Sequence, residues 1–119
     1  MVIKTIEIDG KPVQFKVSAA IPRYYRFKFR RDIIVDMRGL MNEIERNKDG
    51  DSHISITSLE IFENIAYIMA KYADPGIPDS IDEWLDNFET FSIYKILPQL
   101  FELWGLNMET QIESKKKFA

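Results

Sequence analysis

The sequence contains no cysteine among its 119 residues. This absence excludes disulfide bonds, thiolate metal sites and a thiol nucleophile, and it suits a reducing compartment. Long apolar runs are also missing, because charged residues interrupt each one well short of the ~20 residues that span a bilayer. The first ten residues alternate apolar and polar side chains, unlike a secretory signal. We therefore expect no redox chemistry, no export and no membrane partner.

Signatures of catalysis and of ligand binding are missing as well. The chain has no Gly-x-Gly-x-x-Gly pattern and no Gly-rich phosphate-binding loop. Asp49, Asp51 and Glu60 match three positions of a calcium loop, but His53 replaces an oxygen ligand and Ile54 stands where the loop needs glycine. His53 is the single histidine and lies in a polar stretch. We expect no catalytic residue, no metal and no cofactor, and interpret the chain as a binding protein, not an enzyme.

What the sequence does contain is enough apolar material for a core. Hydrophobic residues make up 45% of the chain and charged residues 29%, as in a globular domain of about 100–150 residues. The last apolar periodicity ends near residue 105, and the residues after it are polar. The sequence predicts a single α+β domain over residues 1–107 and a polar tail over 108–119.

The charge is distributed unevenly, although the net charge is only −3. Residues 1–48 contain 11 Lys or Arg against 6 Asp or Glu, whereas residues 49–114 contain 2 against 13. Such a division indicates either two faces of one domain that attract each other or a basic half that meets an acidic partner. We favour the first interpretation.

The hydrophobic period changes from two to about 3.6 near Ser18. Alternating residues on both sides of Asp9-Gly10 predict a β-hairpin over residues 2–17. Apolar residues three and four apart then predict a helix over about 20–46, with Pro22 in its first turn and a bend near Arg30. In this helix Tyr24 and Phe27 are expected on the buried face.

Three further helices complete the predicted fold. Thr57 and Glu60 form a capping-box pattern before a helix over 58–73, which is apolar on most sides and should be central to the core. Ser80 and Glu83 form a second box before a helix over 81–88, and a helix over 92–104 should kink at Pro98. The expected fold class is α+β, an N-terminal β-hairpin followed by a mainly α-helical domain of about four helices.

Cations and aromatics alternate in the segment from Arg23 to Arg31. This pattern occurs where proteins follow a phosphate backbone and stack bases. On a helix, however, it also places aromatics inward and cations outward, and the chain is acidic overall with a pI of about 5.2. We therefore favour a basic protein-binding surface over nucleic acid.

Three segments carry a likeness to a known family: residues 20–32 (AIPRYYRFKFRRD), 62–75 (FENIAYIMAKYADP) and 84–104 (WLDNFETFSIYKILPQLFELW). In order and spacing they resemble the tail assembly chaperones of long-tailed (siphovirus-type) bacteriophages and prophages of Gram-positive bacteria. The likeness covers about residues 2–106. One departure is Arg30, where we expect many relatives to have glycine.

The resemblance implies a protein of the bacterial host cytoplasm that takes part in tail morphogenesis and is absent from the mature virion. Its partners would be the tape measure protein, which it keeps in solution, and the major tail (tube) protein, which it helps to recruit. A homo-oligomer is compatible with this role. For partner binding, in a helix-in-groove mode, the candidate residues are Arg23, Tyr25, Arg26, Phe29, Arg30, Met37 and Met41. For each aromatic residue and methionine of this set taken singly, burial in the core is the favoured alternative.

Two other classes of protein remain open at this point. One is a structural tail or head-completion protein that stays in the virion, and the other is a small nucleic-acid-binding regulator. Members of the resembled family also make a longer product by ribosomal frameshifting, and Lys115-Lys116-Lys117 is where we would place such a slip.

Overall fold

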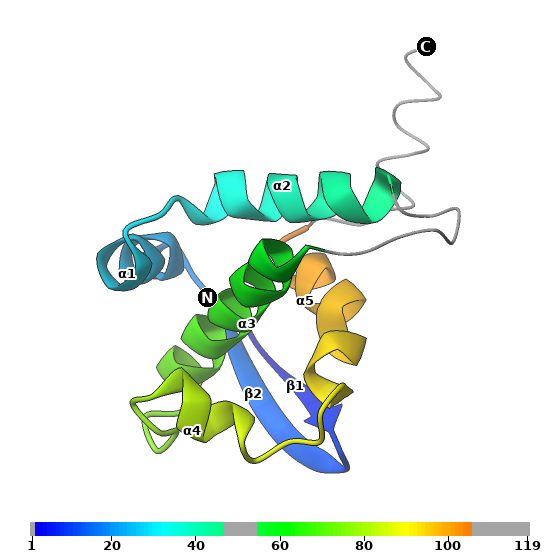
Figure 1. Ribbon diagram of the computed structural model, residues 1–119. Helices are drawn as coiled ribbons and strands as arrows, with labels where there is room; N and C mark the ends of the chain where they lie inside the picture. Colours follow the sequence, from blue (N-terminus) through cyan, green and yellow to red (C-terminus); the bar gives the residue numbers. More distant parts are fainter. Residues whose placement is uncertain (1, 47–54, 106–119) are drawn as a thin grey trace.

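A computed structural model describes residues 2–46 and 55–105 (Figure 1). Two strands come first, β1 (Val2–Ile8) and β2 (Lys11–Val17), and the later elements within the described ranges are helical. The helices are α1 (Ala20–Phe29), α2 (Ile33–Arg46), α3 (Ile56–Ala73), α4 (Ile81–Leu85), the 3-10 helix η1 (Ser92–Ile96) and α5 (Leu97–Leu103). The predicted α+β class is confirmed. The predicted polar tail, His53 and the calcium-like residues Asp49 and Asp51 lie outside the described residues.

The hairpin forms as predicted. β1 and β2 pair antiparallel from Val2 opposite Val17 to Ile8 opposite Lys11. The two turn residues both have positive φ, 56° at Asp9 and 75° at Gly10. A two-residue turn of this kind matches the twist of the strands, and Asp-Gly is among its preferred sequences.

The expected helix over 20–46 is two helices, so its continuity was wrongly predicted. Arg30 has φ 58° and ψ 37°, the left-handed conformation that ends many helices, and its N–H donates to the Arg26 carbonyl at 2.8 Å. Asp32 then begins α2, because its side chain accepts the N–H groups of Ile34 at 2.8 Å and Val35 at 3.4 Å. The break falls where the sequence predicted a bend.

Helix α3 is the centre of the core, as predicted. Phe62, Ile65 and Met69 are buried on it, and it packs against β2, α1, α2 and α4. Its start differs from the prediction: Ser55 is the N-cap residue and its hydroxyl accepts the Ser58 N–H at 3.1 Å. The Thr57 capping box is therefore wrong, because Thr57 already lies inside the helix.

The C-terminal helices are shorter than predicted. Ser80 caps α4 by accepting the Glu83 N–H at 3.4 Å, as expected, but α4 ends at Leu85 and not near residue 88. The Asn87 side chain donates to the carbonyl of Trp84 at 3.2 Å and so satisfies a backbone carbonyl at the end of this helix. The predicted kink at Pro98 is confirmed, since η1 gives way to α5 at Leu97 with Pro98 in the first turn.

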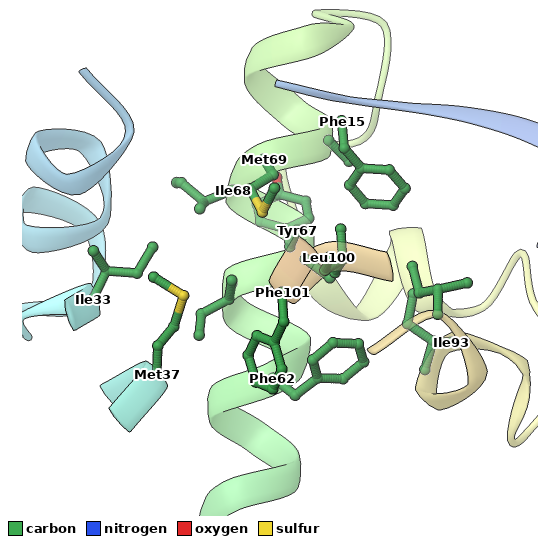
Figure 2. Close-up of a cluster of buried hydrophobic side chains, with 14 of the residues drawn as sticks. Phe15, Ile33, Met37, Phe62, Tyr67, Ile68, Met69, Ile93, Leu100 and Phe101 are labelled. Carbon is green, nitrogen blue, oxygen red and sulfur yellow. The ribbon is translucent and has the colours of Figure 1, made fainter. Parts of the chain in front are cut away.

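The buried side chains form one hydrophobic cluster around α3. Figure 2 shows Phe15 of the hairpin, Ile33 and Met37 of α2, and Ile93, Leu100 and Phe101 of the C-terminal helices approaching α3 from different sides. All of these side chains are buried. The hairpin turn adds polar contacts to the C-terminal region: the Asp9 carboxylate accepts the Glu89 N–H at 2.7 Å and the Ser92 hydroxyl, and Lys11 Nζ donates to the Asn87 carbonyl at 2.9 Å.

Candidate partner-binding surfaces

The junction between α1 and α2 is held by a buried carboxylate. Asp36 accepts a hydrogen bond from the Tyr25 hydroxyl at 2.7 Å. Its two oxygens also accept hydrogen bonds from Nε and Nη2 of Arg31, each at 2.8 Å. The Asp36 side chain is 3% exposed and the Arg31 side chain 50%. These three hydrogen bonds join α1, the linker and α2, so they set the angle of the junction.

The ionisation of Asp36 and Tyr25 follows from this geometry. Burial opposes charge on Asp36, but hydrogen bonds from Arg31 and Tyr25 outweigh it and lower the pKa of Asp36 below its usual value of 3.8. Burial, reinforced by the hydrogen bond to Asp36, raises the pKa of Tyr25 far above its usual value. Both groups thus keep fixed charge states at neutral pH. Their role is therefore structural, and we call Tyr25, Arg31 and Asp36 the clamp between α1 and α2.

The structure divides the predicted binding residues into two groups. Tyr25, Met37 and Met41 are buried in the core, so they do not form an exposed binding surface, although Met37 also lines one of the recesses described below. Tyr25 is buried because it lies four residues after Ile21 on the face of α1 that contacts α3. Phe29 is half-buried, and its ring lies 4.9 Å from that of Tyr25. The exposed members of the set are Arg23, Arg26 and Arg30.

The exposed side of α1 combines cations with one aromatic ring. We call Arg23, Arg26, Phe27, Lys28 and Arg30 the α1 basic surface; all five are exposed. Phe27 was expected on the buried face, yet it is 53% exposed. The guanidinium groups of Arg23 and Arg26 lie 4.8 Å and 5.9 Å from its ring centroid, within reach of cation–π attraction. The surface therefore presents an apolar ring framed by positive charge.

A second surface lies between α2 and the end of α5. Ile34, Met37, Arg38 and Trp104 line a hollow of about 210 Å³. Ile34 is 42% exposed, and the next residue, Val35, is exposed as well. The half-buried indole of Trp104 donates its N–H to the Met69 sulfur at 3.3 Å, which orients the ring. We call this the α2–α5 hollow. It offers an apolar recess beside exposed aliphatic side chains.

A third surface is an open groove of about 470 Å³ between α3, α4 and η1. Its apolar lining comes from Ile56, Leu59, Ile81 and Leu85, and its polar lining from Glu60, Glu63, Asn64, Asp82 and Tyr94. We call it the acidic groove, since all its charged residues are carboxylates. Two contacts hold the segment before α4 against α3. The Tyr67 hydroxyl donates to the Pro78 carbonyl at 2.6 Å, and Lys71 pairs with Asp79 at 2.8 Å.

The favoured interpretation of the uneven charge, attraction between two faces of the domain, is supported at one point. The pKa of Asp79 is lowered mainly by its hydrogen bond to Lys71, and also by the nearby charge of Lys28 on α1. Within residues 2–46 and 55–105 the ion pairs are Arg31 with Asp36 and Lys71 with Asp79. Neither joins the α1 basic surface to the acidic residues after Asp74. The arginines of the α1 basic surface, and Glu60 and Asp82 of the groove, are exposed to solvent.

Sequence reasoning missed the clamp, the α2–α5 hollow and the acidic groove. Asp36 did leave a signal, because it stands between Ile33 and Met37 in the apolar stripe of α2, where a carboxylate needs a partner. The acidic groove left none, since its residues come from separate helices whose relative placement is a tertiary property. In the described part of the chain no three His, Asp or Glu side chains gather as a metal site would require. No described helix combines the length and apolar character needed to cross a membrane.

Comparisons with protein-family models, with curated proteins and with solved structures found no match to this chain.

Proposed function

We propose that this chain is a non-catalytic tail assembly chaperone of a long-tailed phage or prophage. In this role it binds the tape measure protein in the host cytoplasm, helps recruit tail tube subunits and is absent from the finished virion. The support for the family is the likeness of residues 20–32, 62–75 and 84–104 to such chaperones. The support for a binding mode comes from the surface of the domain.

The observation that carries this mode is the α2–α5 hollow. Exposed apolar side chains next to a recess with an aromatic wall are typical of sites where an amphipathic helix places an anchor residue. Ile34 and Val35 provide the apolar contact area, and Trp104 provides the wall. A long tape measure helix would insert one apolar side chain here and cover the exposed aliphatic residues. Shielding of such helices from each other is what keeps an aggregation-prone partner in solution.

Co-expression of the chain with the tape measure protein of the same phage tests the proposal. We expect the wild-type chain to increase the fraction of tape measure protein in solution and to be recovered in complex with it. Ile34→Glu should abolish both effects, because it places a charge in the apolar contact. Ile3→Glu is the matched control, since Ile3 is exposed to a similar extent, 48%, but lies on the hairpin. If the tape measure protein is equally insoluble with and without the chain, and no complex is recovered, the proposal fails.

Mass spectrometry of purified virions separates this role from that of a structural subunit. A chaperone should be absent or present in trace amounts. A copy number comparable with that of tail proteins would show instead that the chain is a structural component.

A further inference from the structure

The arginines of the α1 basic surface, Arg23, Arg26 and Arg30, have no carboxylate partner among the described residues. Phe27 is half exposed between two of these arginines, although aromatic rings usually lose most of their exposure on folding. An exposed ring surrounded by cations is the composition of a protein-binding anchor, because Arg and aromatic residues dominate the energetics of interfaces.

The acidic groove has the complementary composition. Ile56, which is 83% exposed, lines it together with the half-buried Leu59, Ile81 and Leu85. Carboxylates stand on two of its sides: Glu60 and Glu63 on α3 and Asp82 on α4. Its volume of about 470 Å³ leaves room in this open groove for an aromatic ring and parts of the flanking side chains.

We infer that the acidic groove of one copy of this chain binds the α1 basic surface of a second copy, with Phe27 as the anchor. Phe27 would contact the aliphatic lining, while Arg23, Arg26 and Arg30 approach the carboxylates of the groove. The groove cannot take α1 of its own chain. Tyr25 fixes α1 in the core, and the Tyr24 ring stacks on Tyr72 at 3.8 Å between centroids, which holds α1 against the C-terminal half of α3.

This inference does not rest on the proposed function, because it uses a different surface and a different partner. Each copy has one basic surface and one groove, so the contact joins unlike surfaces and can repeat from copy to copy or close on itself. Complementary charges at a partly exposed interface lose attraction as salt screens them. Self-association should therefore depend on concentration and weaken about tenfold or more between 50 mM and 500 mM NaCl.

Analytical ultracentrifugation of the full chain tests the contact. The donor variant is Arg26→Glu/Phe27→Ala, and the acceptor variant is Glu60→Lys/Asp82→Lys. Lys4→Glu, on an exposed strand residue, is a control for the change in net charge of the donor variant. All of the substituted side chains are exposed, so the variants should keep the wild-type circular dichroism spectrum. We expect the wild type and Lys4→Glu to self-associate and the donor and acceptor variants each to sediment as monomers.

Mixing the two monomeric variants distinguishes this contact from other modes of association. The donor variant keeps a working groove and the acceptor variant keeps a working α1, so an equimolar mixture should form a one-to-one complex. A wild-type chain that stays monomeric at high concentration would overturn the inference. So would oligomers that survive both sets of substitutions, a mixture that stays monomeric, or association that is lost instead on changing Lys115, Lys116 and Lys117 to Glu.

Discussion

Replacing Asp36 by alanine should destabilise the domain more than any other substitution of a charged residue in its helices. Asp36 accepts three hydrogen bonds, one from the fully buried Tyr25 and two from the half-exposed Arg31. The bond from Tyr25 to a charged acceptor contributes about 1.5–3 kcal/mol, and its hydroxyl would be left unsatisfied in the core. Water can hydrogen-bond to the half-exposed Arg31 in place of Asp36 more readily than it can reach the buried Tyr25 hydroxyl. Together these effects predict a loss of about 3–5 kcal/mol, as when one partner of a buried ion pair is removed.

Urea denaturation followed by circular dichroism measures this loss as a shift of the midpoint at constant slope. Asp79→Ala is the control, because Asp79 also pairs with a cation, Lys71 at 2.8 Å, but its side chain is 98% exposed. A surface pair of this kind contributes about 1 kcal/mol at most. Tyr25→Phe should cost about 1.5–3 kcal/mol, since it removes one hydrogen bond and leaves the ring in place. A loss below about 1 kcal/mol for Asp36→Ala would refute the structural role of the clamp.

Three further predictions follow from the same structure. The difference in unfolding free energy between wild type and Asp36→Ala should shrink as pH falls below 3.8. The pKa of Asp36 is lowered in the folded state, so its ionised form stabilises the fold above that pH and ceases to do so once it is protonated. Unfolding free energies measured across the acid range check this, and a pH-independent difference would contradict it. Arg30→Gly should raise the free energy of unfolding by about 0.5–1 kcal/mol, since Arg30 has φ 58°, and Arg30→Val should lower it; denaturation midpoints in the opposite order would contradict the helix break. Phe62→Ala should lower the free energy of unfolding by about 3–5 kcal/mol, and Trp104→Ala should lower it by less because Trp104 is only half-buried. Equal or reversed losses of stability in thermal unfolding would contradict this packing.

Local patterns in the sequence predicted most of the secondary structure. The Asp9-Gly10 turn, Ser80 as a cap and Pro98 as a restart are properties of a few adjacent residues, and each was confirmed. The errors arose where two local patterns competed. Thr57 and Glu60 fit a capping box, but Ser55 begins the helix two residues earlier and makes the capping hydrogen bond.

Phe27 was assigned to the wrong face of α1 for a related reason, whereas the arginines face outward and Tyr24 packs against the core as predicted. Both Tyr24 with Phe27 and Ile21 with Tyr25 lie one turn apart, so helical spacing alone does not decide which pair is buried. The hydroxyl of Tyr25 finds Asp36 across the junction, and this contact depends on the break at Arg30. The binding surfaces were beyond sequence reasoning for the same reason. A groove exists only once α3, α4 and η1 have taken their places, and no spacing along the chain encodes that arrangement.

The hydrogen bonds of the hairpin turn have a consequence for the order of events during synthesis. Lys11 contacts Asn87 across 76 residues of sequence, and Asp9 contacts Glu89 and Ser92 across 80 and 83. A ribosome makes the hairpin early, but these partners are synthesised at least 76 residues later. Until then the hairpin edge that η1 and α5 will cover is open. The nascent chain thus depends on η1 and α5 to close the domain, and a stop in translation before residue 87 leaves a fragment with its core exposed.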